Sequence, residues 1–131
     1  MAGSKTNYFE DAVLNVLRGT GITAVTPRIA LYTVQTDGEA STLTEVTNAN
    51  NYARTAVTFG APSGGAMSNS GVVTFPTPSG NWGTIVAWGI VDSATHGGGN
   101  VLYYSDQTPN QTINSGNVVE FAASAITITE T

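Results

Sequence analysis

The sequence predicts a mainly β protein, an antiparallel β-sandwich with one short N-terminal α-helix. Of its 131 residues, 20 are Thr, 13 are Val and 7 are Ile, whereas only 5 are Leu. These β-branched side chains lose rotamer freedom in a helix but pack well on a pleated sheet. After Pro27 the apolar residues recur at every second position, and Gly, Asn and Ser gather between the apolar segments. Both patterns are typical of short strands joined by turns.

Length and charge content indicate one folded domain over residues 1–131. A chain of this length fits a single domain and leaves little room for a second. Apolar residues make up 40% of the sequence and charged residues only 10%. A disordered chain has the opposite balance, with few apolar residues and strong charge repulsion.

The one helix is expected at residues 8–18. Asn7 has N-cap chemistry, and Glu10 follows three positions later, a spacing that can satisfy free amides of the first turn. Gly19 stands where a left-handed residue would end the helix. A face this apolar on a small domain needs a cover, so we expect it to pack on the sandwich or on a neighbouring subunit. This candidate interface consists of Phe9, Val13, Val16 and Leu17.

Eight short strands are expected after the helix. Residues 82–91 form the most apolar segment and should be a central strand. Gly71 interrupts another segment and should make a bulge or a bend there. Turns every 8 to 12 residues are typical of a sandwich or a small barrel. The expected strands are residues 28–34, 43–47, 54–59, 67–75, 82–91, 101–105, 117–122 and 125–129.

Charge and composition exclude several classes of partner. With 4 Lys and Arg against 9 Asp and Glu, the net charge is −5, whereas nucleic-acid binding needs clustered cations. No apolar run approaches the roughly 20 residues that span a bilayer, and the N-terminus lacks a signal-peptide core. The chain has no Cys, so disulfides, a thiol nucleophile and Cys-ligated zinc are excluded. We therefore expect no nucleic-acid or membrane partner.

We expect no enzyme activity, no cofactor and no metal site. The sole His is His96, which lies in a Gly-rich turn, and no Gly-x-Ser-x-Gly segment presents a nucleophile. Asp92 and His96 could supply two metal ligands, but a stable site needs three or four. The segment 37–39 lacks the alternating acids of a calcium loop and fits a hairpin turn better.

Aromatic residues leave one binding alternative open. Exposed rings on a sandwich can stack on sugars, so the sequence also permits a carbohydrate-binding module for host surface recognition. The competing interpretation is that Trp88 and one of two adjacent tyrosines lie in the core, since neighbouring strand residues face opposite sides. The candidate sugar platform consists of Trp82, Tyr103 and Tyr104.

From residue 52 onward the sequence resembles a known family. The similar segments are YARTAVTFGAPSGGAMSNSGVVTFP (52–76), NWGTIVAWGIVD (81–92), GGNVLYYSDQTP (98–109) and INSGNVVEFAASAITIT (113–129). In this order they resemble small tailed-bacteriophage virion proteins that are tail-fibre-like and similar to head decoration proteins. The N-terminal helix and RIALYT (28–33) resemble the opening of that family, whereas residues 37–51 show little resemblance.

The resemblance implies a structural role without catalytic residues. It implies first a capsid decoration (cement) protein that binds the phage major capsid protein at subunit junctions, and second a tail-fibre or baseplate component that binds tail proteins. Such a protein is expected in the virion, after assembly in the host cytoplasm, as a homo-oligomer with a trimer favoured. Contacts are expected from the helix, residues 37–51 and loop tips such as 76–80.

Four positions within the similar segments have a structural interpretation. Tyr52 and Arg54 precede a predicted strand, and we expect them to anchor the preceding loop. Arg54 is one of only four cations and can bind an acid through two parallel hydrogen bonds. Gly64 and Gly65 permit positive φ.

Overall fold

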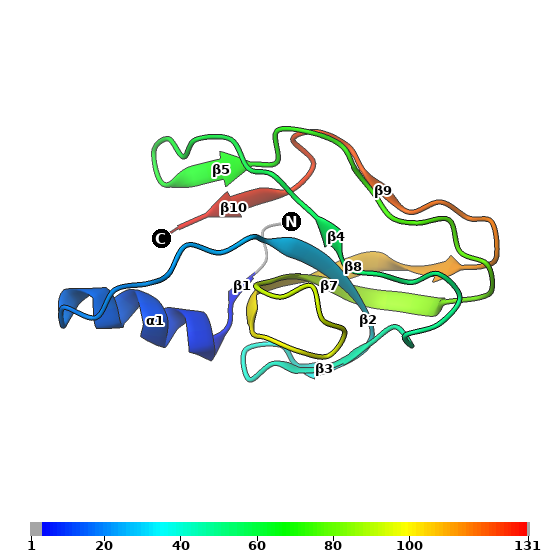
Figure 1. The fold of residues 1–131 in the computed structure, drawn as a ribbon, viewed down its shortest axis with the longest axis horizontal. Helices are drawn as coiled ribbons and strands as arrows, with labels where there is room; N and C mark the ends of the chain where they lie inside the picture. Colours follow the sequence, from blue (N-terminus) through cyan, green and yellow to red (C-terminus); the bar gives the residue numbers. More distant parts are fainter. Residues whose placement is uncertain (1–3, 131) are drawn as a thin grey trace.

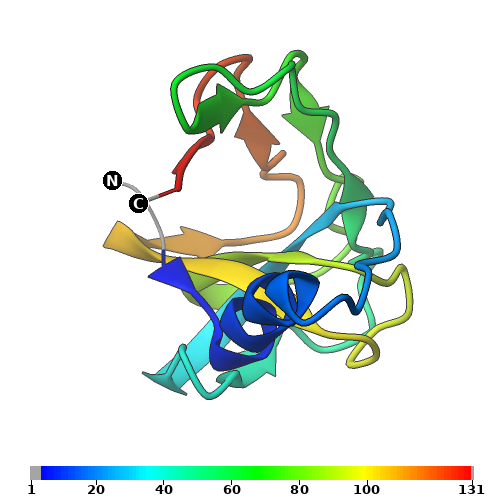
Figure 2. The ribbon, with the colours of Figure 1, turned by 90° about the vertical axis from the view of Figure 1, so that its left-hand side faces the viewer.

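A computed structural model describes residues 4–130 and has two β layers with one helix at one end (Figures 1 and 2). The larger layer is an antiparallel sheet in the order β1-β8-β7-β2-β3, with β4 beside β2. Its strands are β1 (Ser4–Lys5), β2 (Arg28–Asp37), β3 (Thr42–Glu45), β4 (Thr55–Ala56), β7 (Gly83–Val91) and β8 (Val101–Ile113). The mainly β, sandwich-like fold expected from the sequence is confirmed.

The second layer consists of two short antiparallel ribbons and their loops. One ribbon pairs β5 (Ala66–Ser68) with β10 (Thr127–Thr129). The other pairs β6 (Val73–Thr74) with β9 (Glu120–Phe121). Figure 2 shows these ribbons above the sheet, so the sheet has one face covered by protein.

The core lies between the two layers. In β2, Ile29 and Leu31 belong to this core, whereas Ala30 and Tyr32 belong to a smaller cluster on the other face of the sheet. This alternation follows from the two-residue period of a strand. The buried members of the main cluster are Ile29, Leu31, Val46, Tyr52, Val57, Val73, Phe75, Trp82, Ile85, Ile90, Ile126 and Ile128.

A buried asparagine holds the second layer together. The Asn69 side chain is 1% exposed and donates to the carbonyls of Gly71 and Ala122, at 2.8 and 2.9 Å. Its Oδ1 accepts from the Ile126 amide at 2.9 Å. One side chain thus supplies partners for backbone groups that short ribbons leave unpaired.

The helix α1 spans Asn7–Leu17, within one residue of the expected 8–18. The N-cap, however, is Thr6 and not Asn7: the Thr6 hydroxyl accepts from the Phe9 amide at 3.3 Å. Thr6 is held in place because its hydroxyl also donates to β8 carbonyls. The sequence pattern predicted Asn7 because it does not include the tertiary contact with β8 that selects Thr6.

Several strands differ from expectation. Residues 67–75 do not form one interrupted strand, because β5 and β6 pair with different partners. Strand β8 continues to Ile113 through polar residues and Pro109, eight residues beyond the expected end. Proline and polar side chains are tolerated there because that part of β8 lies at the sheet edge. The central position of β7, between β2 and β8, is confirmed.

Candidate interaction surface at the helix end

The end of α1 is built by a tight backbone turn. The Thr20 amide donates to the Asn15 carbonyl and the Gly19 amide to the Val16 carbonyl, each at 3.0 Å. Gly19 has φ +87°, the left-handed conformation that this pair of hydrogen bonds requires. The chain therefore reverses after α1, and residues 20–26 run back along the helix toward β2.

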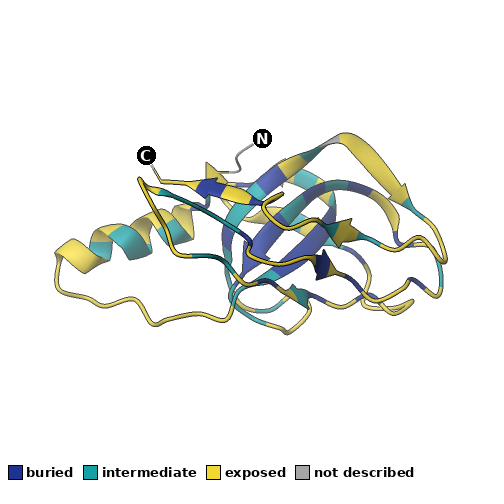
Figure 3. Ribbon diagram, turned by 90° about the horizontal axis from the view of Figure 1, so that it is seen from above, coloured by how far each residue is buried: buried dark blue, intermediate teal, exposed yellow. Residues whose placement is uncertain are grey.

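The apolar stripe of α1 is covered only along its first half. Phe9 and Val13 are half-buried, and the Phe9 ring meets Tyr103 of β8 edge-on, with centroids 5.4 Å apart. Val16 is 49% exposed and Leu17 is 87% exposed. Figures 1 and 3 show the reason: α1 extends past the sheet, so its last turn has no strand beneath it.

Packing on the sandwich is thus seen at Phe9, whereas packing of Val16 and Leu17 on a neighbouring subunit stays a prediction. The apolar residues of α1 have helical spacing throughout. How many of them are buried depends on how far the sheet extends beneath the helix. Leu17 lies outside the sheet's reach, and Leu14, also apolar, is 60% exposed. Together with the exposed Arg18 they form a protruding tip at one end of the molecule, which we call the helix tip (Leu14, Leu17 and Arg18).

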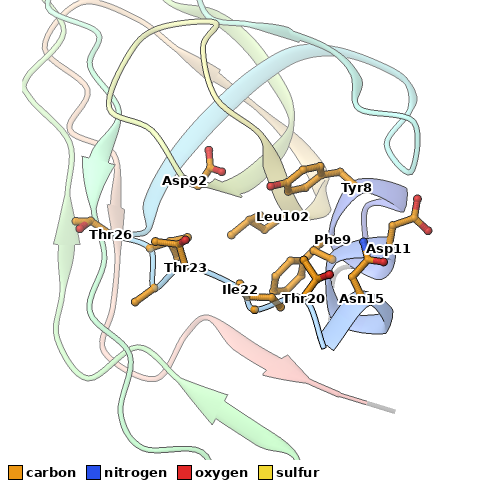
Figure 4. A pocket seen from close by; sticks show the side chains of 14 residues that line it. Tyr8, Phe9, Asp11, Asn15, Thr20, Ile22, Thr23, Thr26, Asp92 and Leu102 are labelled. Carbon is orange, nitrogen blue, oxygen red and sulfur yellow. The ribbon is translucent and has the colours of Figure 1, made fainter. Parts of the chain in front are cut away.

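A groove separates α1 from the returning segment 20–26. Its volume is about 720 Å³, and Figure 4 shows Tyr8, Phe9 and Asn15 on one side with Ile22 and Thr23 on the other. Ile22 and Val25 are exposed apolar residues, 44% and 45% exposed. We call this hollow the helix groove; the sequence analysis did not find it, because residues 20–26 carry no regular apolar period.

A second candidate site is the polar cluster formed by Glu45, Arg54 and Tyr52. Arg54 donates to both carboxylate oxygens of Glu45, and the Tyr52 hydroxyl donates to Glu45 Oε2 at 2.6 Å. Arg54 also donates to the carbonyls of Ser93 and Gly98, at 2.9 Å each. The prediction that Arg54 pairs an acid and anchors a loop is confirmed by these contacts.

Charge states in this cluster are fixed by the hydrogen bonds. Burial alone would raise the pKa of Glu45, but donation from Arg54, Tyr52 and the Gly97 amide outweighs it and holds the pKa below its usual value. Burial would likewise lower the pKa of Arg54, and the Glu45 carboxylate raises it instead. Burial and the bond to Glu45 raise the pKa of Tyr52. The cluster therefore carries a satisfied ion pair and fixes the 93–98 loop.

The residues considered for catalysis or metal binding have separate partners. His96 Nε2 donates to the Val46 carbonyl at 2.7 Å. The Asp92 carboxylate accepts from the amide and side chain of Asn100, at 2.7 and 3.1 Å, and so closes the same loop. In residues 4–130 no group of three His, Asp or Glu side chains could hold a metal ion. Residues 38–41 form the hairpin turn between β2 and β3.

The three rings of the candidate sugar platform do not form one surface. Trp82 is buried, 5% exposed, and its Nε1 donates to the Asn50 carbonyl at 2.8 Å. Tyr103 lies against Phe9, whereas the Tyr104 ring lies over Gly38, at the other face of β8. The expectation that adjacent tyrosines face opposite sides is confirmed, and Trp82 offers no free face to a sugar.

A comparison with known families identifies the family of this chain. Residues 4–129 match a family described as podophage GP4 fiber I protein gp80. The chain belongs to this family. The match confirms the resemblance to phage virion proteins and makes this chain a bacteriophage virion structural protein. Nothing among curated proteins matches the chain.

The family region includes both candidate sites of this virion protein, because it runs from Ser4 through α1 to Thr129. One residue beyond the matched region, the Glu130 carboxylate pairs with Lys5 of β1 and accepts from the Tyr103 hydroxyl, at 2.7 Å to Oε2. These two contacts close one end of the sandwich. Across residues 4–130, the virion protein has no helix with the length and apolarity to cross a bilayer.

Proposed function

We propose that this virion protein is a non-catalytic component of the phage tail fibre that acts through protein–protein contacts. The family description carries the proposal, since its printed name is that of a fibre protein. The structure supports it in two ways. The charged groups of the Glu45–Arg54–Tyr52 cluster are engaged with one another, and six of the nine exposed large apolar residues of the described chain lie in or just after α1.

The absence of catalysis is part of the proposal. A hydrolytic site would need His96 free to exchange a proton with a nucleophile, and its Nε2 is bonded to the Val46 carbonyl. Asp92 is occupied by Asn100. Both side chains therefore serve the 92–100 loop, which suits a scaffold that presents no reactive group.

A capsid decoration role is the second candidate. The expectation rests on the resemblance to head decoration proteins, and the fold supports it as well as it supports a fibre role, because a small two-layer domain can dock on a capsid lattice. The two candidates differ in partner: tail proteins in the first and the major capsid protein in the second.

Labelling of intact particles tests the two candidates directly. Antibodies against the chain, visualised by electron microscopy on whole phage, are expected to bind at the tail. Label distributed over the head lattice would overturn the fibre assignment in favour of decoration. As a control, particles from which the gene has been deleted should carry no label at either place.

A further inference from the structure

The segment 21–26 has a backbone that is free to pair. Within residues 4–130, none of its amides or carbonyls forms a hydrogen bond. Its composition nevertheless favours a strand, because four of its residues are β-branched. These four are Ile22, Thr23, Val25 and Thr26. The segment continues through Pro27 into β2, so it has the composition of a strand but no partner strand.

The backbone of this segment borders the helix groove. Every residue from 20 to 26 lines the groove, although alternate side chains of an extended segment face opposite sides. An unbroken run of lining residues therefore means that the backbone itself faces the hollow. Figures 1 and 3 show the segment returning beside α1. A Cβ added at Gly21 would meet no atom within 4 Å, so the space there is open.

The helix groove offers an apolar surface to an incoming strand. Phe9 and Ala12 of α1 are half-buried, and Leu102 of β8 is buried. Figure 4 shows the Phe9 ring and the Leu102 side chain within the hollow. Ile22 and Val25 add exposed apolar surface from the returning segment. A strand bound here would direct every second side chain toward these residues, so those side chains should be apolar.

Charge at the groove favours basic side chains at the remaining positions. Asp11 and Asp92 line the groove, and no Lys or Arg does. In the part of the chain that the structure describes, Asp11 has no ion-pair partner, and the Asp92 carboxylate is bonded to the neutral Asn100. Arg18 lies on the same flank of α1 as Asp11 but donates to Asn15. Carboxylates without a cationic partner attract Lys or Arg from a binding segment.

We propose that the helix groove binds an extended segment of another virion protein, in which apolar and basic side chains alternate, as an added strand beside residues 21–26. Backbone hydrogen bonds hold the segment, and its side chains give specificity. A second copy of this chain does not fit, because its four cations, at positions 5, 18, 28 and 54, never fall two residues apart.

This inference rests on the proposed function, which assigns protein–protein contacts to the chain, and it names the chemistry of the partner. Labelling of intact phage reports the location of the protein whether or not a peptide binds the groove. Failure of this inference and failure of the proposed function are therefore distinguishable.

Calorimetric titration of the full chain with two blocked peptides tests the partner's chemistry. The peptides have equal length and alternate valine with lysine or with glutamate. The lysine peptide is expected to bind more tightly by about tenfold or more. Asp11→Asn should weaken its binding. Glu10→Gln is the matched control, because it changes the net charge equally at an exposed position that does not line the groove; it should leave binding unchanged. Equal affinity for the two peptides, equal effects of the two variants, or no binding would overturn the proposal.

Amide exchange tests whether the segment pairs through its backbone. In the free chain the amides of residues 21–26 are expected to exchange rapidly, because the residues are exposed and their amides have no hydrogen-bond acceptor within the described chain. With the lysine peptide bound, alternate amides of this run should become protected, since successive N–H groups of a strand point to opposite sides. Unchanged exchange, or equal protection of all six amides, would overturn the strand geometry.

Two adjacent proline substitutions provide a final pair of variants. Thr23→Pro and Ala24→Pro each remove one amide hydrogen that is unbonded within residues 4–130, so the circular dichroism of both variants should match wild type. One of these two amides faces the groove and the other faces away. One variant should therefore lose binding of the lysine peptide, and its neighbour should keep it. Binding by both variants, or by neither, would overturn the proposal.

Discussion

Arg54 holds the carboxylate of Glu45 through two parallel hydrogen bonds of 2.9 Å, from Nε to Oε2 and from Nη2 to Oε1. The two side chains are only 4% and 5% exposed. Each charge has lost its water, and each depends on the other for compensation. This pair connects β3 to the loop before β4, and through Ser93 and Gly98 to the loop after β7.

Removing one partner of this pair should therefore be costly. We expect Arg54→Ala to lower the free energy of unfolding by about 3–5 kcal/mol, because the Glu45 carboxylate stays buried without its partner. The double variant Arg54→Met/Glu45→Leu should lose less than Arg54→Ala, since it leaves no isolated charge. Urea denaturation measures both, with Arg28→Ala as the control. A double variant less stable than Arg54→Ala would contradict this account.

Acid should weaken the fold through the same carboxylate. The pKa of Glu45 is lower in the folded protein than its usual value of 4.5, so its contribution to stability is complete above that value. It is lost as the pH falls through the lower, folded pKa. We expect unfolding free energy to fall steeply below about pH 4.5. Glu45→Gln should start from a lower stability and show a shallower decline; an unchanged slope would assign the effect to other acids.

Phe9→Ala and Leu17→Ala should have different effects on the stability of the single chain. Phe9 is half-buried against Tyr103, so its truncation should cost about 1–2 kcal/mol, less than a fully buried Phe. Leu17 is 87% exposed, and its truncation should change the free energy of unfolding by less than about 0.5 kcal/mol. Denaturation at concentrations where the chain is monomeric tests this contrast. Equal losses would mean that α1 packs along its whole length.

Asn69→Ala should loosen the second layer. It removes three hydrogen bonds and leaves the Ile126 amide buried without a partner, a loss of about 2–4 kcal/mol. Amide exchange should rise first at Ile126 and in β10. Asn110→Ala, at an exposed position, is the matched control and should leave exchange unchanged. If the Ile126 amide stayed protected from exchange in Asn69→Ala, the Asn69 side chain would not be what holds the second layer together.

The sequence predicted what local patterns decide. The β-branched segments and the helix could be predicted from the sequence, because periodicity and cap chemistry act over a few residues. The geometry of the guanidinium group also predicted that Arg54 pairs with an acid. The sequence did not identify that acid as Glu45, because Glu45 lies nine positions away in a segment without a strong pattern. The helix groove was missed for a related reason: it depends on where the sheet ends beneath α1, which no local pattern encodes.

Strand β8 carries features that oppose pairing with a foreign strand. Its pairing with β1 covers only Tyr103 and Tyr104, so its later residues form an edge that another chain could extend. One residue of β7, Val86, faces four of β8, residues 107–110, and Pro109 among them lacks an amide hydrogen. The bulge and the proline interrupt the row of donors that a foreign strand would need. The free edge of β8 is thereby protected from uncontrolled sheet growth, the first step toward amyloid-like aggregation.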